Sequence, residues 1–135
     1  MATDIWIHIE YKSRHKNKFV YDREVDGERV YILFGALAGT RGSCEPVYSP
    51  RGLPNDVTSH TLRIYNEFGK DAHTPSWLTT EEQRDCIDQA IKVFSKEYSL
   101  KEVNSWLSPY EKIFEYMKNK EDKGDLCRIV FWFDN

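Results

Sequence analysis

Both ends of the chain alternate apolar and polar residues with a period of two, and this pattern constrains the fold most. Residues 4–10 read DIWIHIE, and residues 126–134 read LCRIVFWFD. Such alternation is typical of β-strands that bury one face. The last segment is partly apolar on both faces, which favours a central position in a sheet. We therefore expect the first and last strands to be neighbours.

A second strand is expected close to the first. Residues 19–25 place Phe19 and Tyr21 on one side, and Asp26-Gly27 is a turn signal at the end of the segment. The residues between the two strands, 12–18, are mostly basic. We interpret them as the solvent-exposed turn of a β-hairpin.

The segments between the strands carry helix signals. A short apolar helix is expected over residues 30–38 and is stopped by Gly39. Asp56 is a candidate N-cap for a helix over residues 57–68. Thr79-Thr80-Glu81-Glu82 forms a capping box ahead of apolar residues at helical spacing, and Ser108-Pro109-Tyr110-Glu111 predicts the start of a further helix.

These elements predict an α+β fold: a small antiparallel sheet built from the N- and C-terminal strands and covered on one face by three to four central helices. Trp6, His8, Arg128 and Trp132 would then share the opposite face. With 135 residues and 40% apolar content, residues 1–135 suffice for a single domain with its own core.

Composition excludes several classes of function. The formal net charge is −3 at pH 7, so there is no general field that attracts a polyanion, and no long nucleic acid is expected as a partner. The three cysteines lack CxxC spacing and signal neither a disulfide framework nor a zinc site, which fits a reducing cytoplasm. No apolar run reaches transmembrane length, so no membrane partner is expected either.

The segment from Gly39 to Asp56 is long and rich in glycine and proline, which predicts an ordered, stiff loop. Arg41 and Arg51 each precede a glycine, so a guanidinium and bare backbone N–H groups could bind one phosphate or carboxylate. The alternative is that both arginines bind carbonyls of the loop or Glu45. From this loop the predicted ligand-binding residues are Arg41, Gly42, Tyr48, Arg51, Gly52 and Asn55.

The segment from His73 to Trp77 is predicted to form the opposite wall of the same pocket. It adds His73, Ser76 and Trp77 to the candidate ligand-binding residues, although Trp77 could instead pack on the start of the following helix. No catalytic signature is present, and no catalytic residue, metal ligand or cofactor is assigned. The pairs and rows of His, Asp and Glu are too sparse to predict a metal site.

Several short motifs carry a further likeness. They are RVYILF at 29–34, TR at 40–41, PRGLPNDV at 50–57, His73, SWLT at 76–79 and Glu82, preceded by Thr3-Asp4-Ile5 and Glu10. Over roughly residues 1–82 the chain resembles small phage and prophage proteins of unassigned function, although Trp6 stands where a histidine is expected. The resemblance implies a phage-related protein in the cytoplasm of a bacterial host cell. Proteins of this origin often antagonise bacterial defences, and one strategy is to sequester a nucleotide signal.

The first hypothesis is therefore a non-enzymatic binder of an anionic, nucleotide-like small molecule. The abundance of aromatic residues, 14% of the chain, also fits a homo-oligomer. A second hypothesis is a protein-interaction inhibitor of a host enzyme, anchored by Trp6, Trp106 and Trp132. A third is a small hydrolase that uses His73.

Overall fold

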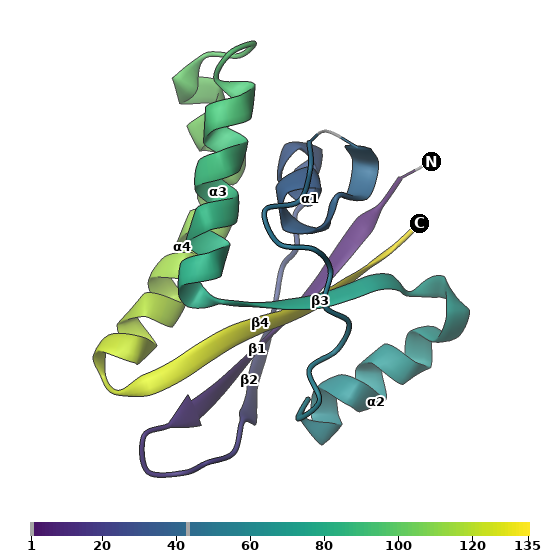
Figure 1. Cartoon of the computed structure of the whole chain (residues 1–135), viewed down its shortest axis with the longest axis vertical. Helices are drawn as coiled ribbons and strands as arrows, with labels where there is room; N and C mark the ends of the chain where they lie inside the picture. Colours follow the sequence, from purple (N-terminus) through teal and green to yellow (C-terminus); the bar gives the residue numbers. More distant parts are fainter. Residues whose placement is uncertain (1, 43) are drawn as a thin grey trace.

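The sheet has four antiparallel strands in the order β2-β1-β4-β3. The computed structural model describes residues 2–42 and 44–135, and its strands are β1 (Asp4–Ser13), β2 (Val20–Val25), β3 (His73–Thr79) and β4 (Asp125–Asp134). β1 and β4 pair along their whole length, with Ile5 opposite Phe133 and Ser13 opposite Asp125. The predicted α+β class, the hairpin of β1 with β2 and the central place of β4 are confirmed (Figure 1).

The sheet is covered on both faces. The helices are α1 (Tyr31–Ala38), α2 (Ser59–Phe68), α3 (Thr80–Phe94) and α4 (Leu100–Asp122), with short 3-10 turns η1 at Thr40–Gly42 and η2 at Gly69–Asp71. α3 and α4 run side by side and lie with α1 on one side of the sheet, whereas α2 lies on the other (Figure 1). The expectation that the helices cover one face only is therefore wrong for α2.

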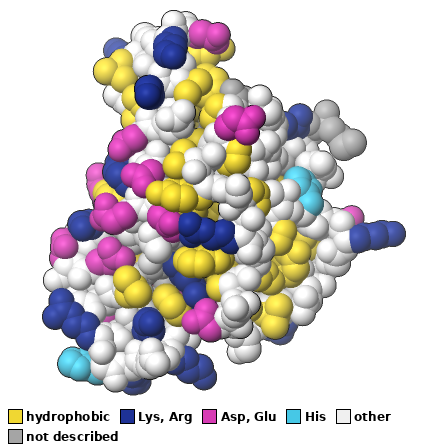
Figure 2. Space-filling view, in the orientation of Figure 1, with side chains coloured by type: hydrophobic (Ala, Val, Ile, Leu, Met, Phe, Trp, Pro, Cys, Tyr) yellow, Lys and Arg dark blue, Asp and Glu magenta, His cyan; other side chains and the backbone are white. Residues whose placement is uncertain are grey.

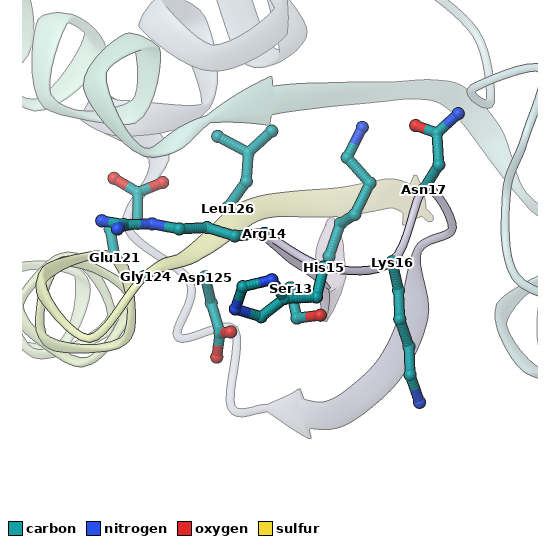
Figure 3. Close-up of a pocket in the computed structure, with 10 residues that line it drawn as sticks. Ser13, Arg14, His15, Lys16, Asn17, Glu121, Gly124, Asp125 and Leu126 are labelled. Atoms are coloured by element: carbon teal, nitrogen blue, oxygen red, sulfur yellow. The ribbon is translucent and has the colours of Figure 1, made fainter.

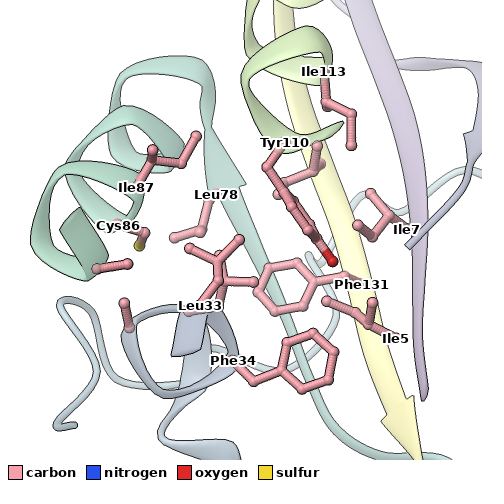
Figure 4. Close-up of a cluster of buried hydrophobic side chains, with 14 of the residues drawn as sticks. Ile5, Ile7, Leu33, Phe34, Leu78, Cys86, Ile87, Tyr110, Ile113 and Phe131 are labelled. Atoms are coloured by element: carbon pink, nitrogen blue, oxygen red, sulfur yellow. The ribbon is translucent and has the colours of Figure 1, made fainter. Parts of the chain in front are cut away.

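The main core lies between the sheet and the helices α1, α3 and α4. It is formed by the odd-numbered side chains of β1 and β4, such as Ile7 and Phe131, which meet Phe34, Ile87 and Tyr110 from the helices (Figure 4). All five side chains are almost completely buried. Burying a side chain of this size contributes about 1.5–3 kcal/mol, so this layer supplies most of the fold's hydrophobic stabilisation.

The second, smaller core lies between α2 and the even-numbered side chains of β1 and β4. The ring of Phe68 lies 5.1 Å from that of Trp6 and 5.6 Å from that of Trp132, and His8 stacks on Trp132 at 5.0 Å. Trp6, His8 and Trp132 do share one face, as predicted. Because α2 covers them, Trp132 and His8 are fully buried.

A buried ion pair anchors the N-terminal end of α2 to the sheet. Arg128 donates to Glu10 at 2.9 and 2.7 Å and to the Asp56 carboxylate at 2.8 Å, and Glu10 also accepts hydrogen bonds from Thr58. Thr58 caps α2 by accepting from the Thr61 N–H. The prediction that Asp56 is the cap is wrong because its carboxylate is bound to Arg128.

α4 begins earlier than the sequence predicts. Ser99 is its N-cap, and Pro109 lies inside the helix instead of at its start. The buried residues of α4 follow one stripe on both sides of Pro109: Val103, Leu107, Tyr110, Ile113 and Met117. Packing of this continuous stripe outweighs the cost of a proline in the helix. By contrast, the capping box of Thr79 and Glu82 that begins α3 is confirmed.

Candidate functional site

Arg51 lies against the protein body. Its guanidinium forms a two-point ion pair with Glu82, at 2.7 Å for Nη1 to Oε1 and 2.5 Å for Nη2 to Oε2, and donates to the Trp77 carbonyl at 3.2 Å. It also lies 4.6 Å from the ring centroid of Trp77 and 5.2 Å from that of Tyr48. A ligand that bound this guanidinium would have to displace the Glu82 carboxylate.

Glu82 takes part both in the capping box of α3 and in the ion pair with Arg51. Its Oε1 accepts from the Thr79 N–H at 3.0 Å while the Glu82 N–H donates to the Thr79 hydroxyl at 3.2 Å, which closes the capping box of α3. The hydrogen bond from Arg51 is the main reason that the pKa of Glu82 is lowered. This carboxylate therefore couples the start of α3 to the loop that precedes α2.

The backbone around Arg51 is docked on β3. The Arg51 N–H donates to the Ser76 hydroxyl at 3.0 Å, and the Gly52 N–H donates to the Pro75 carbonyl at 3.0 Å. Ser76 is 1% exposed. These contacts dock the backbone at Arg51 and Gly52 on β3, and they use both the Ser76 oxygen and the Gly52 amide. Residue 43 of the predicted stiff loop lies outside the described residues.

The Tyr48 hydroxyl donates to Asp85 at 2.5 Å, and this bond is the first cause that raises the pKa of Tyr48 to about 12. Asn55 is exposed. Neither residue lines the hollow that holds the other predicted cation, Arg41.

That hollow has a volume of about 440 Å³ and lies where the two ends of the chain meet η1 and β3. Its lining residues are Thr3, Ala38, Gly39, Thr40, Arg41, His73, Thr74 and Asn135. Of the nine predicted ligand-binding residues, Arg41 and His73 are brought together here, although 32 positions separate them in the sequence. We call this hollow the Arg41–His73 pocket.

A chain of hydrogen bonds orients His73. Its Nδ1 lies 2.9 Å from the Thr74 hydroxyl, and its Nε2 lies 3.2 Å from Asn135 Oδ1, which also accepts from the Thr3 hydroxyl at 2.9 Å. Because Asn135 Oδ1 is an acceptor, the neutral imidazole carries its proton on Nε2 and accepts from Thr74 at Nδ1. The ring is therefore fixed by side chains from β3 and from both ends of the chain.

Arg41 is held over the ring of Tyr31. Its guanidinium carbon lies 4.6 Å from the ring centroid, and the Tyr31 hydroxyl accepts from the Thr3 N–H at 3.1 Å. That backbone hydrogen bond, with a contribution from Arg41, lowers the pKa of the Tyr31 phenol. Near the end of α1, the carbonyls of Gly35 and Ala36 accept from the N–H groups of Gly39 and Val47.

The backbone of this pocket is strained. Among the described residues, the non-glycine residues with positive φ are Arg41 at 69° and Thr74 at 54°, and both line the Arg41–His73 pocket. Positive φ is unusual for a β-branched residue such as Thr74 and costs on the order of 1–3 kcal/mol. Thr74 sits at a register irregularity between β3 and β4, between His73 and Ser76.

Sequence reasoning missed the contributions of Thr3, Tyr31, Thr74 and Asn135. A signal for two of them was present, because pairing of the first and last strands brings the two ends of the chain together. The strand character of residues 73–79 was also missed. Pro75 and the irregular pairing at Thr74 interrupt the alternation that identifies a strand.

Three other features bear on function. Within the described residues, no group of three or more His, Cys, Asp or Glu side chains is placed to hold a metal ion. The three cysteines are free thiols, and burial raises the pKa of Cys44. In the described part of the chain, no helix combines the length and apolar character needed to cross a bilayer.

Comparisons of this chain with models of protein families, with curated proteins and with solved structures find no match.

Proposed function

We propose that this protein binds a small anionic molecule, nucleotide-like in its chemistry, in the Arg41–His73 pocket. One observation carries the proposal: a hollow of about 440 Å³ gathers a guanidinium, an imidazole, three threonines and an amide, and no Asp or Glu is among its described lining residues. The volume is within the range of small-molecule sites. The local balance of charge favours an anion even though the whole chain is negative.

The pocket offers suitable partners for phosphate. Arg41 supplies a charged, forked donor, and the threonine hydroxyls and the Asn135 amide supply neutral hydrogen bonds to ester oxygens or a sugar. The positive φ values of Arg41 and Thr74 support a binding role, because such strain persists where a site needs a particular geometry. The hydrogen-bonded His73 ring adds a flat surface at one wall.

The resemblance to small phage proteins supports a biological role for such a site. We propose that the protein is phage-related and sequesters a nucleotide signal of bacterial defence in the host cytoplasm, without transforming it. In this proposal the protein forms a homo-oligomer. His73 is hydrogen-bonded to a hydroxyl and an amide, so the described contacts supply no carboxylate to orient it as a general base.

The alternative of a tryptophan-anchored interaction surface has less support. Trp132 is completely buried and Trp6 packs against Phe68 of α2. Trp106 is 38% exposed and contacts Tyr98, with ring centroids 5.1 Å apart. Of the three expected anchors, Trp106 is exposed, Trp6 is half-buried and Trp132 is buried.

A thermal-shift assay tests the proposed function. The protein is titrated with a panel of cyclic mononucleotides, cyclic dinucleotides and ADP-ribose, with inorganic phosphate as a reference. A ligand at 100 times its Kd stabilises the native state by about 2.7 kcal/mol, which raises Tm by several degrees. Mass spectrometry of the denatured protein asks in parallel whether a small molecule was carried through purification.

Matched variants locate the binding. Arg41→Gln and His73→Gln remove the two ionisable side chains of the pocket, while Arg63→Gln removes an arginine that is 62% exposed on α2. We expect the first two variants to lose ligand-induced stabilisation and the third to keep it. The proposal is refuted if no nucleotide in the panel raises Tm, or if Arg41→Gln responds as the unmodified protein does.

A further inference from the structure

A second hollow lies at the opposite end of the sheet from the Arg41–His73 pocket. It has a volume of about 610 Å³ and lies between the β1–β2 turn and the turn from α4 into β4. Residues 12–17 line one side, and Glu121, Gly124, Asp125 and Leu126 line the other (Figure 3). We call it the hairpin hollow. In the space-filling view, basic side chains gather at this end of the molecule (Figure 2).

Three side chains of the hairpin hollow have no bonded partner among the described residues. Arg14, His15 and Lys16 are exposed, and no side-chain hydrogen bond or ion pair to another described residue holds them. The two carboxylates of the hollow are engaged elsewhere. Glu121 accepts from Thr80 and from the backbone N–H of residue 127, at 2.9 and 3.1 Å, and Asp125 lies 3.7 Å from the ammonium of Lys120.

The basic side chains spread apart. Arg14 reaches across the hollow toward the side of Glu121, whereas Lys16 points away from it (Figure 3). Gly124 leaves room for Arg14, because a Cβ at that position would lie 3.1 Å from Arg14 Nε, and its φ of 107° favours glycine. A single small anion would be met by converging donors. Diverging cations instead suit a ligand whose charges repeat along a chain.

We propose that the hairpin hollow binds the phosphodiester backbone of single-stranded nucleic acid. Lys12, Arg14 and Lys16 each neutralise one phosphate, the exposed His15 ring stacks on a base, and the Asn17 amide reaches a base edge. This site departs from the expectation of no long nucleic-acid partner, which rests on the overall charge. A net charge of −3 leaves the binding weak and confined to this one turn.

Salt dependence gives the sharpest test. Fluorescence anisotropy with labelled 20-nucleotide oligothymidylate and oligouridylate measures Kd between 25 and 150 mM NaCl. Three neutralised phosphates predict a slope of log K against log salt of about −2 for a single strand. The double variant Arg14→Gln/Lys16→Gln is expected to reduce the slope to between about −0.5 and −1 and to weaken binding at 25 mM salt at least fivefold.

The matched control removes two lysines at the far end of the molecule. Lys96 is exposed in the turn between α3 and α4, and Lys101 is exposed in the first turn of α4. This end of the two helices lies away from the hairpin (Figure 1). Lys96→Gln/Lys101→Gln makes the same change in net charge and should leave both slope and Kd nearly unchanged. Circular dichroism and Tm confirm that both double variants fold.

Three outcomes overturn the proposal. The first is a slope near zero, and the second is equal loss of binding in the two double variants. The third is equal displacement of the oligonucleotide by tripolyphosphate or polyglutamate at the same charge concentration, which would show a general polyanion contact. Arg41→Gln should not affect oligonucleotide binding, so this test and the test of the Arg41–His73 pocket can fail independently.

Discussion

The ion pair of Arg51 with Glu82 decides whether the arginine of the RGLP segment is structural. A double-mutant cycle with Arg51→Met and Glu82→Gln isolates it. Methionine keeps an unbranched apolar stem between Tyr48 and Trp77. Glutamine can still close the capping box with Thr79, so this substitution removes the charge and leaves the helix cap.

The structure sets the size of the effect. The Arg51 and Glu82 side chains are 25% and 21% exposed, which places the pair between exposed pairs worth about 0.2–1 kcal/mol and buried pairs whose breaking costs about 3–5 kcal/mol. We expect Arg51→Met to lower the free energy of unfolding by about 2–3 kcal/mol. The double variant should be about 1.5 kcal/mol more stable than the sum of the single effects, because neither charge is then left alone.

The pH dependence has a definite sign. Arg51 lowers the pKa of Glu82 in the folded protein, so the stabilisation is present above the unfolded pKa near 4.5 and is lost as pH falls through the folded pKa. Between pH 6 and pH 3 the unmodified protein should therefore lose more stability than Glu82→Gln does. The other carboxylates titrate in both proteins and cancel in the difference.

Urea denaturation followed by tryptophan fluorescence measures all four proteins of the cycle. A coupling energy below about 0.5 kcal/mol, together with an Arg51→Met variant as stable as the unmodified protein, would refute a structural role. If that variant also lost its thermal shift with a nucleotide, the binding site would have to include Arg51. A large coupling energy would leave Arg41 as the cation of the small-molecule site.

Three further predictions concern single positions. Burial lowers the pKa of His8 from 6.5 to about 4, so about 3 kcal/mol of unfolding free energy is lost as pH falls from 7 toward 4. In urea titrations at each pH, His8→Gln should abolish this loss, and the control His15→Gln should retain it. Ser99→Ala should cost about 1 kcal/mol of unfolding free energy and Ser108→Ala almost nothing, since Ser99 alone is the cap of α4; equal effects would contradict the observed helix start. Asparagine tolerates positive φ, so the Thr74→Asn variant should have a higher Tm than the Thr74→Val variant. A higher Tm for Thr74→Val would show that no backbone strain is stored at Thr74.

Much of the fold could be predicted because its signals are local. The alternation in β1 and β4, the turn signal after β2 and the capping box of α3 each depend on residues close in sequence. Two elements could not be predicted in this way. The stripe of α4 that runs past Pro109 becomes stable only when it packs on the sheet and α3, and β3 becomes a strand only by pairing with β4.

The candidate site was less predictable for a related reason. Composition identified Arg41 and Arg51 as equivalent cations of one stiff loop. The partner that separates them, Glu82, lies 31 residues beyond Arg51 and belongs to a different element. His73 could be expected near the loop, but the hydroxyl and amide that orient it come from Thr74 at a strand irregularity and from Asn135 at the end of β4.

Several arginines of this protein join one element of the fold to another. Arg51, Arg84 and Arg128 each form an ion pair with a carboxylate of another element, and each guanidinium also lies over an aromatic ring. These arginines therefore hold elements of the fold together. Arg14 and Arg41 instead line hollows of about 610 and 440 Å³. An anionic ligand that bound one of these arginines that join elements would have to break an ion pair between two elements, and this would cost stability. For this reason, the two hollows at opposite ends of the sheet carry the functional proposals, and the ion pair of Arg51 with Glu82 does not.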